Sequence, residues 1–220
     1  MSVDLKRLVE GIEKAKNSSK KRNFTQSVDL IVNLRDVDPK KPEHRMLELI
    51  ELPNPVSKDV KVCVIGSGQF ALEAKRLGAD KVIEREELEA LAKNKKMARK
   101  LAQSYDFFIA EAPLMPLIGR ALGSLLGPRG KMPTPVPSNA SLNEVLDKHK
   151  KLVRVRVRDQ PTIQCRVGVE NMDSEKIAEN ILTILRRIEE KFGSLARYVS
   201  SILVKTTMGK PVEIEVGRRR

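Results

Sequence analysis

One segment of the sequence has the pattern of a dinucleotide-binding loop. Gly66, Gly68 and Ala71 follow the apolar run KVCVIG, and Glu84 ends the next expected strand 18 residues after Gly66. In a dinucleotide-binding fold, such glycines let the backbone approach a pyrophosphate, and an acidic residue binds the ribose. The same glycines are common wherever a strand packs closely on a helix, and no candidate for hydride transfer lies nearby. A nucleotide-dependent enzyme is therefore retained only as the alternative interpretation.

Other residues that carry out chemistry in proteins also lack the arrangement that catalysis or metal binding needs. The segment GPRGKM differs from a phosphate-binding loop at Leu125 and Met132, where that loop has glycine and serine or threonine. The chain has two histidines and two cysteines, and their spacing suits no zinc site. No serine–histidine–aspartate or cysteine–histidine set can be proposed. The sequence therefore predicts a protein that has no cofactor or metal and is not an enzyme.

The charge of the chain indicates a polyanionic partner. Lysine and arginine total 42 against 29 acidic residues, which gives a net charge of +13 and a pI near 9.8. Nucleic acid is the commonest partner of such a surface, although a thermostable protein rich in lysine and glutamate can also lean basic. Aromatic residues make up only 3% and tryptophan is absent. Stacking on single-stranded bases is therefore less expected than contacts with the backbone of a structured RNA.

The sequence has no feature of a membrane or secreted protein. No apolar run is long enough to cross a bilayer, and the charged N-terminus lacks the apolar segment of a secretory signal. The two cysteines, Cys63 and Cys165, lie 102 positions apart, which is typical of a chain from a reducing compartment. We expect a cytoplasmic protein with no membrane partner.

Two basic segments are candidates for phosphate contacts. A loop rich in glycine and proline carries Arg129 and Lys131, and it is either a stiffened surface loop or a loop that contacts phosphate. Arg154, Arg156 and Arg158 alternate with valines. Such a row forms either the solvated face of an antiparallel sheet or a ladder of phosphate contacts.

A further candidate is the turn formed by Thr206, Thr207, Met208 and Gly209 between two expected strands. Hydroxyl groups can bond to ribose 2′-OH groups, methionine can pack on a sugar or base, and glycine permits close approach of a backbone. An ordinary hairpin with a buried methionine explains the same residues. Taken alone, the turn favours the ordinary hairpin.

The sequence predicts two kinds of domain that position these candidates. Between residues 56 and 152, strands and helices alternate, which is typical of a parallel sheet with helices on both faces. In this part we expect one long helix over residues 85–103 and an irregular loop over 127–141. Both ends of the chain instead carry helices and alternating antiparallel strands. We predict an α+β domain from residues 1–55 plus 153–220, with an α/β domain inserted over 56–152.

Three longer motifs occur in order along essentially the whole chain: KRNFTQSVDL, DFFIAEAPLMPLIGRALGSLLGPRGKMPTPVP and VKTTMG. Together they resemble the L-one family of large-subunit ribosomal proteins, in its archaeal or eukaryotic-cytosolic branch, and the long middle motif is highly specific. The resemblance implies a discontinuous, split α+β sandwich domain with an inserted Rossmann-like parallel α/β domain. It thus explains the glycine motif without a nucleotide.

The resemblance also implies the partners of the chain. Members of the family bind large-subunit rRNA and form the mobile stalk beside the tRNA exit site. Many members also bind a similar structure in their own mRNA and repress its translation. We therefore expect rRNA, the chain's own mRNA and tRNA in the exit region as partners of a protein that is monomeric when free.

Carried over residue by residue, the resemblance implies an RNA surface made by both ends of the chain. Its expected members are Phe24, Thr25, Gln26, Ser27, Gln164, Arg166, Ser201, Thr207, Met208 and Gly209. Contacts with phosphate are expected from Lys40, Arg129, Lys131, Arg154 and Lys210. The sequence departs from the family at Lys210, because the family has proline directly after the glycine and here Pro211 comes one position later. We expect this turn to differ slightly from that of its relatives.

Overall fold

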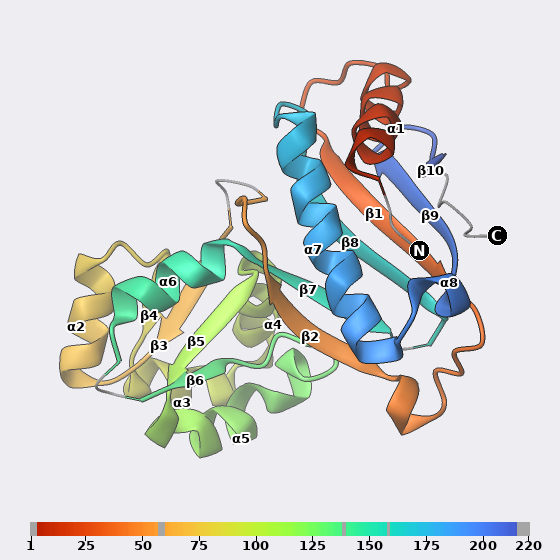
Figure 1. Ribbon diagram of the computed structural model, residues 1–220. Helices are drawn as coiled ribbons and strands as arrows, with labels where there is room; N and C mark the ends of the chain where they lie inside the picture. Colours follow the sequence, from red (N-terminus) through yellow and green to blue (C-terminus); the bar gives the residue numbers. More distant parts are fainter. Residues whose placement is uncertain (1–3, 57–59, 138–139, 158, 215–220) are drawn as a thin grey trace. The chain divides into compact units, whose positions relative to one another are not determined.

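A computed structural model describes residues 4–56, 60–137, 140–157 and 159–214, and it divides the chain into two compact units (Figure 1). The terminal unit comprises residues 1–57 with 151–220, and the inserted unit comprises residues 58–150. Antiparallel sheets come from the two ends of the chain, and a parallel four-stranded sheet with helices lies between them in the sequence. The predicted fold class is confirmed. No helix among the described residues is long and apolar enough to cross a membrane.

The terminal unit is built on a four-stranded antiparallel sheet with the strand order β10-β9-β1-β8. These strands are β1 (Ser27–Leu34), β8 (Thr162–Val169), β9 (Val199–Thr206) and β10 (Val212–Ile214). Two further strands, β2 (Met46–Glu51) and β7 (Leu152–Val157), form an antiparallel ribbon. The helices are α1 (Leu5–Asn17), η1 (Pro42–His44), α7 (Ser174–Phe192) and α8 (Leu195–Tyr198).

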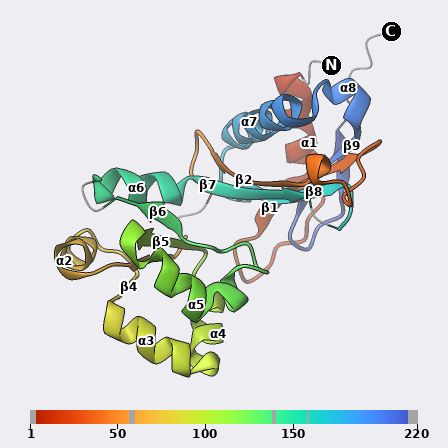
Figure 2. The ribbon, with the colours of Figure 1, turned by 90° about the horizontal axis from the view of Figure 1, so that it is seen from below.

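Alternation along β1 gives the sheet one buried face and one open face. Val28, Leu30 and Val32 are fully buried, whereas the side chains between them are half-buried. Successive side chains of a strand point to opposite faces, so the buried set defines the face that α1 and α7 cover. Figure 2 shows both helices on the same side of this sheet. The described part of the terminal unit places no helix over the other face, which we call the open face.

Lys16 fixes the end of α1. Its Nζ donates to the carbonyl oxygen of Met172 and to Ser174 Oγ at 3.3 Å, at the start of α7. Burial lowers the pKa of this ammonium group, and the charges of Asp173 and Glu13 oppose that effect. The chain therefore leaves α1 at a defined place and leads directly into the segment before β1.

The inserted unit contains a parallel sheet with the strand order β4-β3-β5-β6. Its strands are β3 (Val62–Ile65), β4 (Lys81–Ile83), β5 (Phe107–Glu111) and β6 (Thr134–Val136). Its helices are α2 (Gly68–Arg76), α3 (Arg85–Lys93), α4 (Lys95–Ser104), η2 (Ala112–Leu114), α5 (Met115–Leu126) and α6 (Leu142–Lys150). The central strands β3 and β5 are buried along their whole length, as expected of a parallel sheet covered on both faces. Figure 2 shows α6 on one side and α3, α4 and α5 on the other.

Two sequence predictions in the inserted unit are wrong. The single long helix expected over residues 85–103 is divided at Asn94, whose side chain accepts a hydrogen bond from the backbone N–H of Met97 at 3.2 Å and so begins α4. The irregular loop expected over residues 127–141 contains β6. Pro135 lies in this strand because β6 is at the edge of the sheet, where the missing N–H breaks no ladder on the outer side.

His149 ties α6 to β6 in the inserted unit. It is 4% exposed, its Nδ1 lies 2.7 Å from the carbonyl oxygen of Val145, and its Nε2 lies 3.2 Å from Thr134 Oγ1. Its ring meets that of Phe107 edge to face. Burial lowers the pKa of His149, although the bond to Val145 opposes this effect. The neutral imidazole is therefore the form that the folded protein favours.

We predict that His149 makes folding stability depend on pH below about 6.5, the usual pKa of an unfolded histidine. As pH falls from there toward the lower pKa of the folded state, the unfolded chain takes up the proton first, so stability is lost. Urea unfolding at pH 7 and pH 5 should show this loss, and His149→Gln should reduce it. His44→Gln, which replaces the other histidine, should lose as much stability between pH 7 and pH 5 as the wild type. The assignment would be contradicted if His149→Gln also lost as much stability as the wild type.

Candidate nucleic-acid interface

The open face of the terminal sheet carries side chains in rows that run across the strands, and the two outer rows are polar while the middle row contains Ile31 and Leu203. The register of β8, β1 and β9 aligns three such rows. They are Arg166–Asp29–Lys205, Gln164–Ile31–Leu203 and Thr162–Asn33–Ser201. The first row places one acid between two bases, so the face offers positive charge without a large repulsion of its own.

The last row is joined by hydrogen bonds. The side-chain amide of Asn33 donates to Ser201 Oγ at 2.9 Å, and Thr162 Oγ1 donates to Asn33 Oδ1 at 3.3 Å. Asn33 therefore holds the two hydroxyl groups that flank it. Ser201 lies six residues before Thr207 on the β9 side, which is about 20 Å along an extended strand. The predicted surface thus reaches from one end of the open face to the other.

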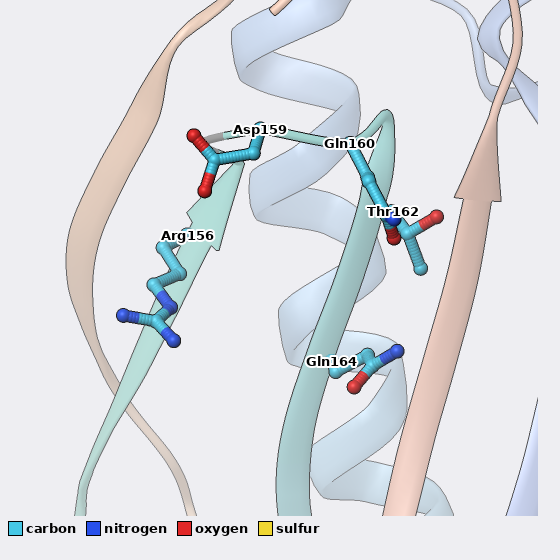
Figure 3. Close-up of a pocket in the computed structure, with 5 residues that line it drawn as sticks. All are labelled: Arg156, Asp159, Gln160, Thr162 and Gln164. Carbon is cyan, nitrogen blue, oxygen red and sulfur yellow. The ribbon is translucent and has the colours of Figure 1, made fainter.

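A polar pocket of about 380 Å³ opens beside this row, between the ends of β7 and β8. Its lining residues are Arg156, Asp159, Gln160, Thr162 and Gln164 (Figure 3). Figure 3 shows Arg156 on β7 and Gln164 on β8, on the two sides of the space. Gln164 is exposed here, as is Arg166 farther along β8. The outer side of β7 therefore continues the open face.

The arginine row on β7 is only partly exposed. Arg154 is half-buried and lies opposite Leu49, whereas Arg156 is exposed and lies opposite Leu47. Arg158 lies outside the described residues. Of the row of three arginines in the sequence, the described residues therefore contain two, and these lie in different environments; the ladder of phosphate contacts stays one of the two interpretations.

The other end of the face is organised around Gln26, which is 1% exposed. Its side-chain Nε2 donates to Ser19 Oγ at 3.0 Å and to Glu170 Oε2 at 3.2 Å, and its Oε1 accepts from the backbone N–H of Met208 at 3.2 Å. Its backbone N–H also donates to Glu170 Oε1 at 3.1 Å. We name residues 19–27, Glu170 and 206–209 the Gln26 corner. Gln26 joins its three segments by contacts inside the protein, so its side chain positions neighbours rather than facing outward.

Thr207 makes a second tie within the Gln26 corner. Its Oγ1 accepts from the backbone N–H of Ser27 at 2.9 Å and lies 3.0 Å from Ser27 Oγ. The backbone N–H of Thr207 donates to the carbonyl oxygen of Ser27 at 3.0 Å. The turn after β9 is therefore fastened to the start of β1, 180 residues away in the sequence.

Gly209 is required by a close approach within the same turn. Its N–H donates to the carbonyl oxygen of Thr206 at 3.1 Å, and a Cβ added to Gly209 would lie 2.2 Å from Thr206 Oγ1. Thr206 is fully buried, and its hydroxyl finds no hydrogen-bond partner among the described residues. A larger residue at position 209 would have to displace this packed hydroxyl.

The Gln26 corner exposes two large apolar side chains. Phe24 is 51% exposed and Met208 is 60% exposed, and Thr25 between Phe24 and Gln26 is also exposed. The buried methionine of an ordinary hairpin is therefore wrong for this turn. The exposed bases of the same region are Lys20, Lys21, Arg22 and Lys210. The Gln26 corner therefore presents apolar groups, hydroxyls and positive charge together. Apolar side chains can pack on riboses, and positive charges can pair with phosphates.

The remaining predicted phosphate contacts lie elsewhere. Lys40 is exposed in the loop that follows β1, at the end of the strand opposite to Ser27. Arg129 and Lys131 belong to the inserted unit, and both are half-buried. Lys131 Nζ donates to the carbonyl oxygens of Ala102 at 3.1 Å and Tyr105 at 2.6 Å, so its charge stabilises the end of α4.

Comparison with known proteins identifies the family. The model of the ribosomal protein L1p/L10e family matches residues 14–210. Large ribosomal subunit protein uL1 from Methanothermobacter thermautotrophicus is 49% identical over 207 residues, which cover 94% of this chain and 98% of the relative. The protein of the same name from Archaeoglobus fulgidus is 49% identical over 214 residues (97% and 100%), and that from Pyrococcus horikoshii is 48% identical over 216 residues (98% and 98%). This chain belongs to the ribosomal protein L1p/L10e family.

Membership of the L1p/L10e family makes the chain a ribosomal protein and not an enzyme, so the nucleotide-dependent alternative is wrong. The inserted unit gives its glycine motif a structural role. Ser67, between the two glycines, donates from its backbone N–H and its Oγ to Glu111 Oε2, at 3.0 and 2.8 Å. This carboxylate joins the ends of the central strands β3 and β5. In a dinucleotide-binding fold the pyrophosphate occupies that crevice.

Several residues of this L1p/L10e protein that build the interface were not found from the sequence. Glu170 and Asn33 fix Gln26 and Ser201, yet neither has a local pattern that marks it, because their partners lie more than a hundred residues away. The bases from Lys20 to Arg22 form a visible run, but they resemble any basic turn. Only the fold reveals that this run adjoins the turn after β9.

We predict that Gly209→Ala destabilises the protein by about 1–3 kcal/mol, the usual cost of forcing an extra methyl group into a packed site. Thr206→Ala in the same chain removes the oxygen that the new methyl group meets. The two substitutions should therefore be non-additive, with the double variant more stable than the sum of the single effects predicts. Urea unfolding of the four proteins measures this coupling. The control is Gly119→Ala, where an added Cβ meets nothing within 4 Å. Strict additivity of Gly209→Ala and Thr206→Ala would refute the close approach.

Proposed function

We propose that this protein is a component of the large ribosomal subunit that binds rRNA through the Gln26 corner and the open face of the terminal sheet. The observation that carries the proposal is the exposure of Phe24 and Met208 on a frame that the hydrogen bonds of the buried Gln26 side chain hold together. Relatives that match nearly the whole chain are named large ribosomal subunit protein uL1. A ribosome of the cytoplasm is the expected location.

The proposed recognition rests on shape more than on charge. Gln26, Glu170 and Thr207 hold the corner before RNA arrives, so little ordering remains to oppose binding. Phe24 and Met208 then pack on sugars or bases, and exposed hydroxyls such as that of Thr25 bond to 2′-OH groups. Lys20, Lys21, Arg22 and Lys210, with Arg166 on the open face, contact phosphates.

The first test removes the exposed apolar groups. We predict that Phe24→Ala combined with Met208→Ala lowers affinity for an rRNA fragment by tenfold or more, because neither shortened side chain can pack on the RNA. The variant should fold normally, since exposed side chains add little to stability and surface changes usually stay within about 0.5 kcal/mol. Filter binding measures the affinity, and circular dichroism verifies the fold.

A matched control distinguishes this site from nonspecific binding by any exposed apolar side chain. Leu72→Ala removes an apolar side chain that is 57% exposed on α2 of the inserted unit. It should leave rRNA affinity unchanged. The proposal fails if the double variant, correctly folded, binds rRNA as well as the wild type, or if Leu72→Ala costs as much.

The finer part of the proposal concerns the place on the ribosome and a second RNA. We propose that the rRNA is the mobile stalk beside the tRNA exit site, and that the chain represses translation of its own mRNA. Family resemblance supports this part.

We predict that the leader of the chain's own mRNA competes with the rRNA stalk fragment for one site. An mRNA fragment with the local structure of the rRNA stalk should displace labelled rRNA completely. Phe24→Ala combined with Met208→Ala should lower the affinity for both RNAs by a similar factor. Competition binding with an mRNA leader of equal length and scrambled sequence provides the control. Simultaneous binding of both RNAs would contradict a shared site.

A further inference from the structure

Helix α4 of the inserted unit carries a face made of bases. Lys95, Lys96, Arg99 and Lys100 are all exposed, and their spacing of one, four and five residues places them on one side of a helix. The adjoining side contains Ala98 and Ala102, each 1% exposed, which pack into the core of the unit. Gln103 continues the exposed side. We name Lys95, Lys96, Arg99 and Lys100 the α4 basic face.

This arrangement is unfavourable for the helix itself. Lys95 and Arg99 form a like-charge pair at a spacing of four residues, as do Lys96 and Lys100, and such pairs destabilise a helix. Lysines in the first turn also oppose the positive end of the helix dipole. The helix contains no acidic residue. By contrast, the preceding helix α3 has Glu86 and Glu87 in its first turn.

The bases of the α4 basic face also lack partners within the protein. Elsewhere in the inserted unit, four other bases pair with acids: Lys75–Glu84 at 2.7 Å, Lys81–Glu87 at 2.8 Å, Arg85–Glu89 at 3.4 Å and Lys150–Asp147 at 3.1 Å. In the described part of the chain, no ion pair or hydrogen bond engages the four side chains of the α4 basic face. The α4 basic face therefore gathers, on one rigid element, four bases that are unpaired among the described residues.

The end of α4 adds to this charge. Lys131 Nζ binds the carbonyl oxygens of Ala102 and Tyr105, so it fixes the loop after α5 against that end of the helix. Arg129 belongs to the same loop, and Lys93 is exposed at the end of α3, just before α4 begins. The basic surface thus extends beyond the helix at both ends.

We propose that the α4 basic face is a second RNA-binding surface, which contacts the phosphate backbone of a structured RNA without reading its bases. The inference rests on the proposed function of the chain as an rRNA-binding protein. Bound phosphates offset the repulsion within the like-charge pairs. They also offset the unfavourable position of the lysines at the positive end of the helix dipole. A membrane surface fits less well, because Ala98 and Ala102 are buried in the core of the unit and Met97 is the one large apolar side chain of α4 that is exposed, too little to hold the helix in a bilayer.

The test uses the full chain with all four bases replaced: Lys95→Gln, Lys96→Gln, Arg99→Gln and Lys100→Gln. Removal of the repulsion should leave the melting temperature equal to or above that of the wild type. Affinity for RNA should fall about tenfold or more at low salt. The slope of log K against log salt should shrink by about two or more, since each phosphate that the protein neutralises contributes up to about 0.9 to that slope.

The matched control replaces four paired bases of the same unit: Lys75→Gln, Lys81→Gln, Arg85→Gln and Lys150→Gln. It removes the same charge from the same unit, so a decrease in affinity caused by net charge alone would appear equally in both variants. The proposal predicts a decrease at least fivefold smaller in this control. Equal decreases in the two variants, or no decrease in the α4 variant, would overturn it.

Two RNA arms distinguish the source of the phosphates. If the α4 variant weakens binding of the rRNA stalk fragment, the surface contacts the same RNA as the Gln26 corner; if it weakens only binding of a folded tRNA, it contacts a separate RNA. Either result supports the proposal. Failure of the wild type to bind the rRNA fragment would refute the proposed function alone, because the tRNA arm still tests the α4 basic face. An unchanged affinity in both arms, with an acidic peptide bound instead, would refute the second RNA surface.

Discussion

The terminal unit depends on the hydrogen bonds of one buried amide, that of Gln26. This side chain joins a segment near the start of the chain to Glu170 and to the turn at Met208, which are 144 and 182 residues away in the sequence. A buried amide is costly unless its donors and acceptors are bonded, so the three segments must be in place together for any one of them to be stable. Phe24 lies two residues before Gln26 and the backbone of Met208 is bonded to it, and both side chains are exposed.

How much the sequence predicted depended on the range of the interaction. The apolar run of β3 and the alternation along β7 and β8 predicted the two kinds of sheet, because periodicity is a local property. Asn94 was misjudged because the flanking residues all favour helix, and only the bond to Met97 shows that a new helix begins. The family resemblance identified the turn at Thr207, but Glu170 and Asn33 were missed because their partners are distant in the sequence.

The inserted unit shows how a nucleotide-binding architecture serves without a nucleotide. Its central strands end side by side, as in any doubly wound sheet, and this produces a crevice lined by backbone N–H groups. Here Glu111 is 9% exposed and supplies the negative charge that those groups need, through the bonds to Ser67. The preference for an anion at the start of a helix is thus met by the protein itself. Of the two glycines, Gly68 is required for its φ of 52° and Gly66 for close packing. Gly66 illustrates this, since an added Cβ would lie 2.3 Å from the ring of Phe70.

The two units differ in the residues that surround their bases. On the open face of the terminal sheet, Asp29 lies between Lys205 and Arg166 in the register, so attraction offsets repulsion before RNA binds. On α4 no acid intervenes, and the repulsion is tolerated because Ala98 and Ala102 anchor the helix in the core of the inserted unit. Salt screens exposed charges within about 10 Å at 0.1 M, so a surface made only of bases gives affinity that falls with salt. Packing and hydroxyl contacts of the kind proposed for the Gln26 corner are not screened, so the proposed function assigns discrimination among RNAs to that corner.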